Sequence, residues 1–193
     1  MSRIVAISGT LLVSMFLANS SSASSDYTID QEHTTVSFRV GHGKWSKYQG
    51  IVRKVMGKIV FDKEHIERST VQVEMNAMSV DTMNVGRDFE VQGYGMLEAA
   101  KNPKITFTST SVEKTGENTG TIVGNMGMAG VTRPVTLAVI FDGEGLSPWD
   151  NAQRVAFSAA GTINTSDFGF KDLIRLEIGP MLDFSIEVEA TTY

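Results

Sequence analysis

The chain has 193 residues, of which 41% are hydrophobic, so it fits a single folded domain and lacks the composition of a disordered protein. It contains no cysteine, which excludes disulfides, thiolate metal sites, cysteine catalysis and attachment as a lipoprotein. The net charge is −5 and basic residues form no long stretch, so we expect no nucleic-acid partner.

The first 23 residues have the pattern of a secretory signal peptide. Arg3 supplies a positive start, a mainly apolar stretch covers residues 4–18, and Ser21 and Ala23 satisfy the small-x-small rule for cleavage. The alternative is a membrane anchor, but a spanning helix needs about 20 mainly apolar residues and this stretch is shorter. We therefore expect a signal peptide at 1–23, a mature domain at 24–193, a periplasmic or secreted location, and no stable membrane insertion.

Short segments of alternating apolar and polar residues follow one another along the mature chain. They cover residues 34–40, 57–61, 71–76, 105–108, 135–141, 155–163 and 182–190. A period of two is typical of strands that bury one face. With the weaker segments included, the chain has about eight or nine strands, which predicts an all-β antiparallel sandwich or barrel. Alternation does not distinguish the two, although a closed barrel of about eight strands can hold one small ligand.

One stretch departs from the strand pattern. Residues 81–93 predict a short helix with Asp81 or Thr82 as its N-cap, and residues 96–100 predict one further helical turn. We therefore expect a short helical insertion near residues 81–100 in an otherwise all-β chain.

The sequence carries none of the motifs of the common enzyme classes. His33, His42 and His65 lack the spacing of a zinc site, so we interpret each as a structural or solvated residue. There is no G-x-S-x-G motif, and the glycine pairs do not complete a nucleotide-binding loop. Glu187 and Glu189 share the polar side of the last strand, whereas a glycosidase pair faces across a cleft. We predict no catalytic residue, no cofactor and no metal.

Phenylalanine and methionine occupy many apolar positions of the alternating segments. Flexible methionines suit a pocket that accepts a long chain, but a solid core has the same pattern. Gly57, Gly124, Gly127, Ala159 and Gly161 also fall in predicted strands. Glycine within a strand marks a bend, a bulge or the close approach of a ligand. These small residues indicate either strong barrel curvature or space left open inside.

Six segments resemble those of the YceI-like family, in the same order and across nearly the whole mature chain. The most specific is G-V-T-R-P-V at residues 130–135. The others are I-D-x-x-H-x-x-V-x-F at 29–38, G-x-I-x-F-D at 57–62, S-V-D-T followed by N and R-D at 79–88, N-P-x-I-x-F at 102–107 and I-N-x-S-D-F-G at 163–169. The chain departs from the family where histidine is frequent, with Phe89, Glu90 and Val91 after R-D and with Ala129 before G-V-T.

The resemblance implies an extended, eight-stranded, lipocalin-like antiparallel barrel. Members are typically bacterial, exported and non-catalytic, hold a polyisoprenoid or similar amphiphile, and often dimerise, so the resemblance implies a lipid partner and leaves a homodimer open. Transport, storage or stress protection is the implied role. Two alternatives stay open: an enzyme acting on a quinone or isoprenoid, and a structural module with a solid core.

On the carrier hypothesis, we expect apolar side chains to line a lumen and a cation to meet the ligand head group. Arg87 is the candidate for the head group, since a guanidinium suits phosphate or carbonyl oxygens, and an ion pair with Asp81 or Asp88 is the alternative. The expected lining residues are Phe38, Phe61, Met75, Phe107, Met126, Phe141, Phe157 and Phe168.

Overall fold

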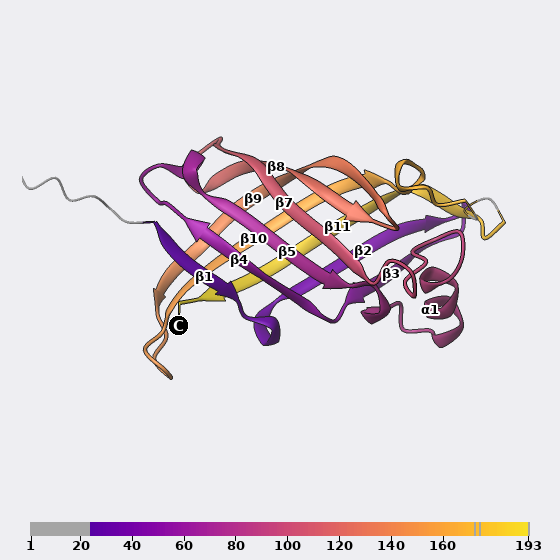
Figure 1. Ribbon diagram of the computed structural model, residues 1–193, viewed down its shortest axis with the longest axis horizontal. Helices are drawn as coiled ribbons and strands as arrows, with labels where there is room; N and C mark the ends of the chain where they lie inside the picture. Colours follow the sequence, from indigo (N-terminus) through magenta and orange to yellow (C-terminus); the bar gives the residue numbers. More distant parts are fainter. Residues whose placement is uncertain (1–23, 172, 174, 193) are drawn as a thin grey trace, which may run out of the picture.

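The computed structural model describes residues 24–171, 173 and 175–192, so the predicted signal peptide at 1–23 lies outside the described residues. The described chain is an elongated barrel of antiparallel strands with a short helix, α1 (Val85–Gln92), at one end (Figure 1). The strands are β1 (Ser25–Ile29), β2 (Thr35–His42), β3 (Ser46–Val52), β4 (Val55–Phe61), β5 (Thr70–Asn76), β6 (Val80–Asp81), β7 (Lys104–Lys114), β8 (Thr119–Met128), β9 (Val131–Leu146), β10 (Gln153–Asn164) and β11 (Ile178–Thr191). Short 3-10 helices lie at η1 (Gln31–His33), η2 (Ile66–Arg68), η3 (Ala77–Ser79) and η4 (Thr165–Phe168).

The sheet closes on itself because the first strand pairs with the last. Thr28 and Ile29 of β1 lie opposite Thr191 and Ala190 of β11. Three barrel strands are bent and interrupted: η1 separates β1 from β2, residues 53–54 separate β3 from β4, and η3 separates β5 from β6. Both halves of each bent strand pair with the same neighbour, so the eleven segments form eight barrel strands in up-and-down order. The predicted eight-stranded antiparallel barrel is confirmed, and the sandwich is excluded.

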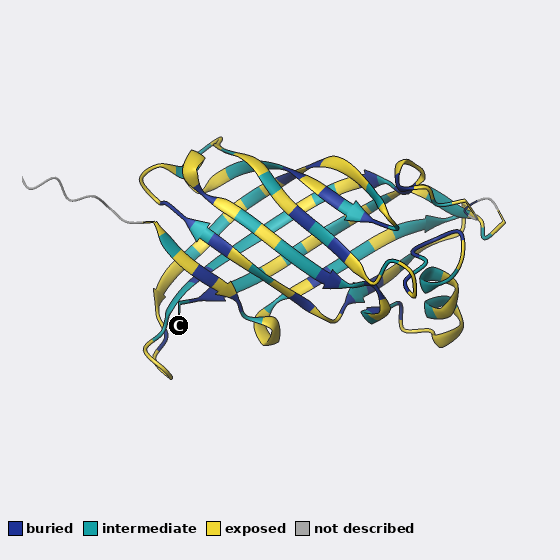
Figure 2. Cartoon of the chain, in the orientation of Figure 1, coloured by how far each residue is buried: buried dark blue, intermediate teal, exposed yellow. Residues whose placement is uncertain are grey.

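Alternation along each strand separates an apolar inner face from a polar outer face. In β11, the inner face carries an unbroken apolar series and the outer face carries exposed acidic and hydroxyl side chains, as expected for a strand with one wet side. Figure 2 shows the same alternation of burial along the strands around the barrel. The inward residues of β11 are Leu182, Phe184, Ile186 and Val188, and the exposed outward ones are Asp183, Ser185 and Glu187.

The predicted helix exists, but its N-cap is neither Asp81 nor Thr82. The cap is Asn84, whose side-chain oxygen accepts a hydrogen bond from the Arg87 amide at 3.0 Å. Asp81 is instead hydrogen bonded to Arg53 and to the amide of residue 83, and Thr82 is buried with its hydroxyl donating to Asp88.

The second expected helical turn, at residues 96–100, is also wrong. Hydrogen-bonded turns replace it, because the left-handed backbone of Gly95 (φ 79°) and Glu98 (φ 47°) prevents a continuous helix. The turns fold the segment back on α1, and the Leu97 and Ala99 amides donate to carbonyls of Val91 and Gln92. No helix within the described ranges is long and apolar enough to cross a membrane.

Candidate ligand-binding site

The barrel encloses a cavity of about 390 Å³ whose wall is almost entirely apolar. This volume falls within the range of ligand pockets. Many wall residues, including Phe184, Ile186 and Val188, face inward yet are only half-buried, because they border empty space rather than packed side chains. A solid core would bury these positions. The interior is therefore hollow over part of its length.

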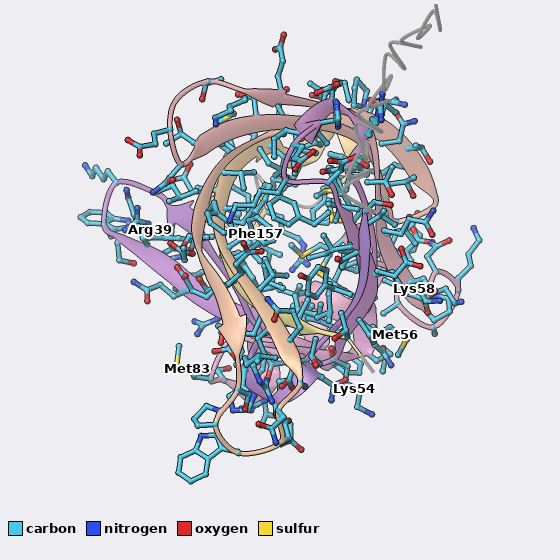
Figure 3. The ribbon with its side chains drawn as sticks, turned by 90° about the vertical axis from the view of Figure 1, so that its left-hand side faces the viewer. Arg39, Lys54, Met56, Lys58, Met83 and Phe157 are labelled. Atoms are coloured by element: carbon cyan, nitrogen blue, oxygen red, sulfur yellow. The ribbon has the colours of Figure 1, made fainter. Side chains whose placement is uncertain are left out.

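Seven of the eight expected lining residues lie in the cavity wall. Figure 3, which looks along the barrel, shows Phe157 in the interior and the labelled Arg39, Lys58 and Met83 at the periphery. Whether the seven contact a ligand stays a prediction. The seven are Phe38, Phe61, Met75, Phe107, Met126, Phe141 and Phe157.

The eighth, Phe168, does not line the cavity. It belongs to η4 and is 2% exposed, because it packs against the hydrophobic cluster of the barrel without bordering the cavity. Phe170, two residues later, lines the cavity in its place. The left-handed Gly169 (φ 86°) ends η4 between the two rings. Strand alternation does not apply across such a turn, so the sequence pattern could not assign these two side chains.

The cavity opens to solvent at one end of the barrel. The exposed members of its wall come from the β4–β5 connection and from the β7–β8 hairpin, including the strand ends, and we call them the mouth: Lys63, Lys114, Glu117, Asn118 and Thr119. Lys63 forms an ion pair with Glu144 of β9, and its ammonium lies 5.7 Å from the centre of the Phe141 ring. Sequence reasoning missed the mouth, because these polar side chains lie in hairpin connections that only the barrel brings together.

Three aromatic rings lie just inside the mouth. Phe61 of β4, Phe141 of β9 and Phe157 of β10 have ring centres 5.3–5.6 Å apart in each pairing. These separations are in the favourable range for aromatic contact. A chain that passes the mouth therefore meets an aromatic surface first.

At the opposite end, apolar residues from outside the strands cover the lumen. Val91 of α1, Leu97 of the following turns and Phe170 line this end, and each is buried or half-buried. None of the described wall residues at this end is exposed. The described cavity is therefore a tunnel with a polar mouth at one end and an apolar floor beneath α1.

Arg87 lies at the α1 end but is not part of the cavity wall. Its guanidinium lies 4.2 Å from the centre of the Tyr48 ring and donates to the carbonyl oxygen of Thr82 at 2.6 Å. Its Nε is buried and has no hydrogen-bond partner among the described residues. The alternative of an ion pair with Asp81 or Asp88 is not found either, since Asp81 pairs with Arg53 and Asp88 accepts from Thr82.

A cluster of charged residues joins the two ends of the chain near η1, and we call it the closure network: Asp30, His33, Arg154 and Glu189. Arg154 Nη1 lies 2.9 Å from Asp30 Oδ2 and 3.5 Å from Glu189 Oε2, and His33 Nδ1 lies 2.8 Å from Asp30 Oδ2. Asp30, His33 and Glu189 have the ligand types of a metal site and lie within 4.8 Å of one another. The guanidinium of Arg154 already occupies the position of a cation, so we interpret the network as structural.

The network shifts the pKa values of its members. Partial burial raises the pKa of Asp30, but hydrogen bonds from His33, Arg154 and the Glu32 amide outweigh this effect and bring the pKa to about 2. The hydrogen bond to Asp30 raises the pKa of His33. The other histidines also have ordinary partners outside the cavity wall: His65 pairs with Asp62 at 3.5 Å and His42 stacks on Tyr48.

The family model of the YceI-like domain matches residues 27–190, nearly the whole described chain. The chain belongs to the YceI-like family. This YceI-like chain is 36% identical over 183 residues to a UPF0312 protein of Azotobacter vinelandii, covering 92% of this chain and 93% of the relative.

Solved structures of other proteins share the barrel. BcnA of Burkholderia cenocepacia matches with a TM-score of 0.75 at 20% identity, covering 84% of this YceI-like chain and 99% of BcnA. A polyisoprenoid binding domain from Saccharophagus degradans, implicated in plant cell wall breakdown, matches with a TM-score of 0.65 at 14% identity, covering 86% and 98% of the two chains. At these identities the matches establish the fold.

Proposed function

We propose that this protein binds a long-chain amphiphile, of the polyisoprenoid class or similar, with its tail in the lumen and its head at the mouth. The hollow apolar tunnel with one polar end carries the proposal. The barrel shared with a polyisoprenoid binding domain supports the choice of ligand class. Each methylene buried in such a tunnel contributes about 0.8 kcal/mol, so a long tail supplies most of the affinity.

The orientation follows from where polar atoms can be satisfied. A head group placed beneath α1 would meet Val91, Leu97 and Phe170 and would lose its hydrogen bonds to water. At the mouth, Lys63 and Asn118 offer donors beside bulk solvent. We therefore place the head group at the mouth rather than at Arg87.

A carrier role fits the wall better than catalysis does. The ionisable residues of the described wall are Lys63, Lys114 and Glu117, and all three are exposed. An active site needs convergent polar groups held in a desolvated position. We propose a non-catalytic protein that is exported by the signal peptide at residues 1–23 and that carries or stores its ligand in the periplasm or outside the cell. A homodimer stays a prediction from the family resemblance.

Two adjacent alanines provide the test. Ala159 faces the lumen, and Ala160, the next residue of β10, is exposed on the outer face. Ala159→Trp should fill the tunnel, whereas Ala160→Trp adds the same side chain outside. The mature proteins, purified in mild detergent-free buffer, are examined by native mass spectrometry, and organic extracts are analysed for lipids.

We expect a lipid adduct in the wild type and in Ala160→Trp, and its loss in Ala159→Trp. Loading with straight alcohols of increasing length should raise affinity by about fourfold for each methylene until the tunnel is full. A wild-type protein that emerges without lipid and takes up none of these alcohols would refute the proposal, as would equal lipid retention in the two tryptophan variants.

A further inference from the structure

Three inward-facing glycines each lie beneath the ring of a phenylalanine on the neighbouring strand. A methyl group placed on Gly161 of β10 would lie 2.6 Å from Cζ of Phe184 on β11. On Gly50 of β3, the distance to Cζ of Phe38 on β2 would be 2.4 Å. Carbon atoms in contact are normally about 3.5–4.0 Å apart, so each ring occupies the space that a side chain would need.

Two of these pairs form one continuous row across four strands. Phe184 and Phe38 are direct partners on β11 and β2, and Gly161 and Gly50 are their partners on the outer sides. Phe184 extends over Gly161 on β10, and Phe38 extends over Gly50 on β3. The two rings therefore lean away from each other and lie along the wall instead of projecting into the lumen.

The third pair lies on the other side of the barrel. Phe107 of β7 extends over Gly124 of β8, where an added methyl group would lie 2.3 Å from its Cζ. In the closed strand order, β7 and β8 are four positions from β11 and β2, which places them diametrically opposite. The phenylalanine rings therefore lie against opposite walls of the barrel, and all three line the cavity.

We propose that Gly50, Gly124 and Gly161 set the width of the lumen, and that this width selects a methyl-branched chain over a straight one. The inference rests on the proposed function and refines its ligand class. A straight chain in a wide tunnel leaves gaps that forfeit dispersion contacts, whereas a branched chain fills them. If a ring were pushed inward, the lumen would lose the width that the branches require.

Gly161→Ala is the cleanest perturbation. Besides the Phe184 ring tip, the nearest atoms to the new methyl group are the Thr136 carbonyl oxygen at 3.1 Å and Leu137 Cδ2 at 3.2 Å, so the ring is the group that must move. Gly41→Ala is the matched control, because a methyl group on Gly41 of β2 meets no atom within 4 Å. Affinities are measured for phytanol and hexadecanol, two saturated alcohols that have main chains of the same length with and without methyl branches.

We expect the wild type to prefer phytanol, Gly161→Ala to lower that preference by about tenfold, and Gly41→Ala to leave it unchanged. Phe184→Leu alone should raise the preference, and Phe184→Leu combined with Gly161→Ala should restore it to near the wild-type value.

An unchanged preference in a folded Gly161→Ala variant overturns the inference while leaving the proposed function intact. If Gly161→Ala does not fold, an unchanged preference in Phe184→Leu overturns it. A wild type that binds neither alcohol refutes the proposed function itself, and a wild type that binds both equally refutes only the selection of branched chains.

Discussion

The substitution Asp30→Asn tests whether the closure network stabilises the barrel, because its effect on the free energy of unfolding should depend on pH. The pKa of Asp30 falls from 3.8 to about 2 in the folded protein, a difference that corresponds to about 2.4 kcal/mol at 1.36 kcal/mol per unit. The Asp30 side chain is 15% exposed, but its partners Arg154 and His33 are 25% and 55% exposed, so solvent screens the interaction. We therefore expect Asp30→Asn to lower the free energy of unfolding by about 1–2 kcal/mol at pH 7.

The direction with pH follows from the lowered pKa. A carboxyl group with a depressed folded-state pKa stabilises the protein above its unfolded pKa, and this contribution disappears as the pH falls through the folded pKa. The difference between wild type and Asp30→Asn should be largest near pH 5, should shrink as the pH rises through the raised pKa of His33, and should vanish between about pH 4 and pH 2. Denaturant titrations at several pH values measure it. Asp150→Asn is the control, because Asp150 also bonds Arg154 but lies in the β9–β10 connection and should have a smaller effect. Equal acid sensitivity of Asp30→Asn and the wild type would refute the stabilising role.

Four further substitutions test the roles assigned to individual side chains. Phe168→Ala should lower the free energy of unfolding by about 3–5 kcal/mol in thermal or denaturant melts and leave lipid selectivity unchanged. Phe157→Ala, in the half-buried lumen wall, should lower it by less than about 3 kcal/mol and weaken lipid retention. A larger loss of stability in Phe157→Ala than in Phe168→Ala would contradict the places assigned to the two rings. Arg87→Lys should lower the free energy of unfolding by about 1 kcal/mol, because the hydrogen bond to the Thr82 carbonyl is lost. Native mass spectrometry should show the same lipid retention as in the wild type. Loss of lipid from this variant would indicate that the head group lies at the α1 end. His33→Gln should destabilise the protein more at pH 5 than at pH 8 in denaturant titrations. A histidine whose pKa is raised on folding stabilises the protein below its unfolded-state pKa, and this contribution is lost as the pH rises through its folded-state pKa. A stability difference between the variant and the wild type that does not depend on pH would contradict this prediction.

The regular part of the barrel could be predicted because it depends on local alternation. Each apolar position of β11 is followed two residues later by another, and the structure places four of them in the lumen wall. The same pattern placed Phe38, Phe107 and Phe157 on inward faces, where they lie. The direction of each side chain follows once one face of a strand is known to be apolar.

Features that depend on contacts between distant segments could not be predicted. Asp81 looks like a good N-cap in isolation, but its carboxylate binds Arg53, 28 residues earlier, so Asn84 caps α1. The interruptions within the first three barrel strands, such as η1, leave no local signature that sets them apart from ordinary turns. Gly124 and Gly161 were among the small residues singled out in the predicted strands and Gly50 was not, and only the strand register shows that Gly161 lies under Phe184.

The tunnel of the described chain has an exposed rim at one end and a covered floor at the other. On the proposed carrier role, a ligand would therefore enter and leave through the same rim, tail first on entry and head first on exit. A donor and an acceptor would both have to meet this rim, so the protein could not contact both at once. Transfer would then take two successive encounters, with release from the donor before contact with the acceptor.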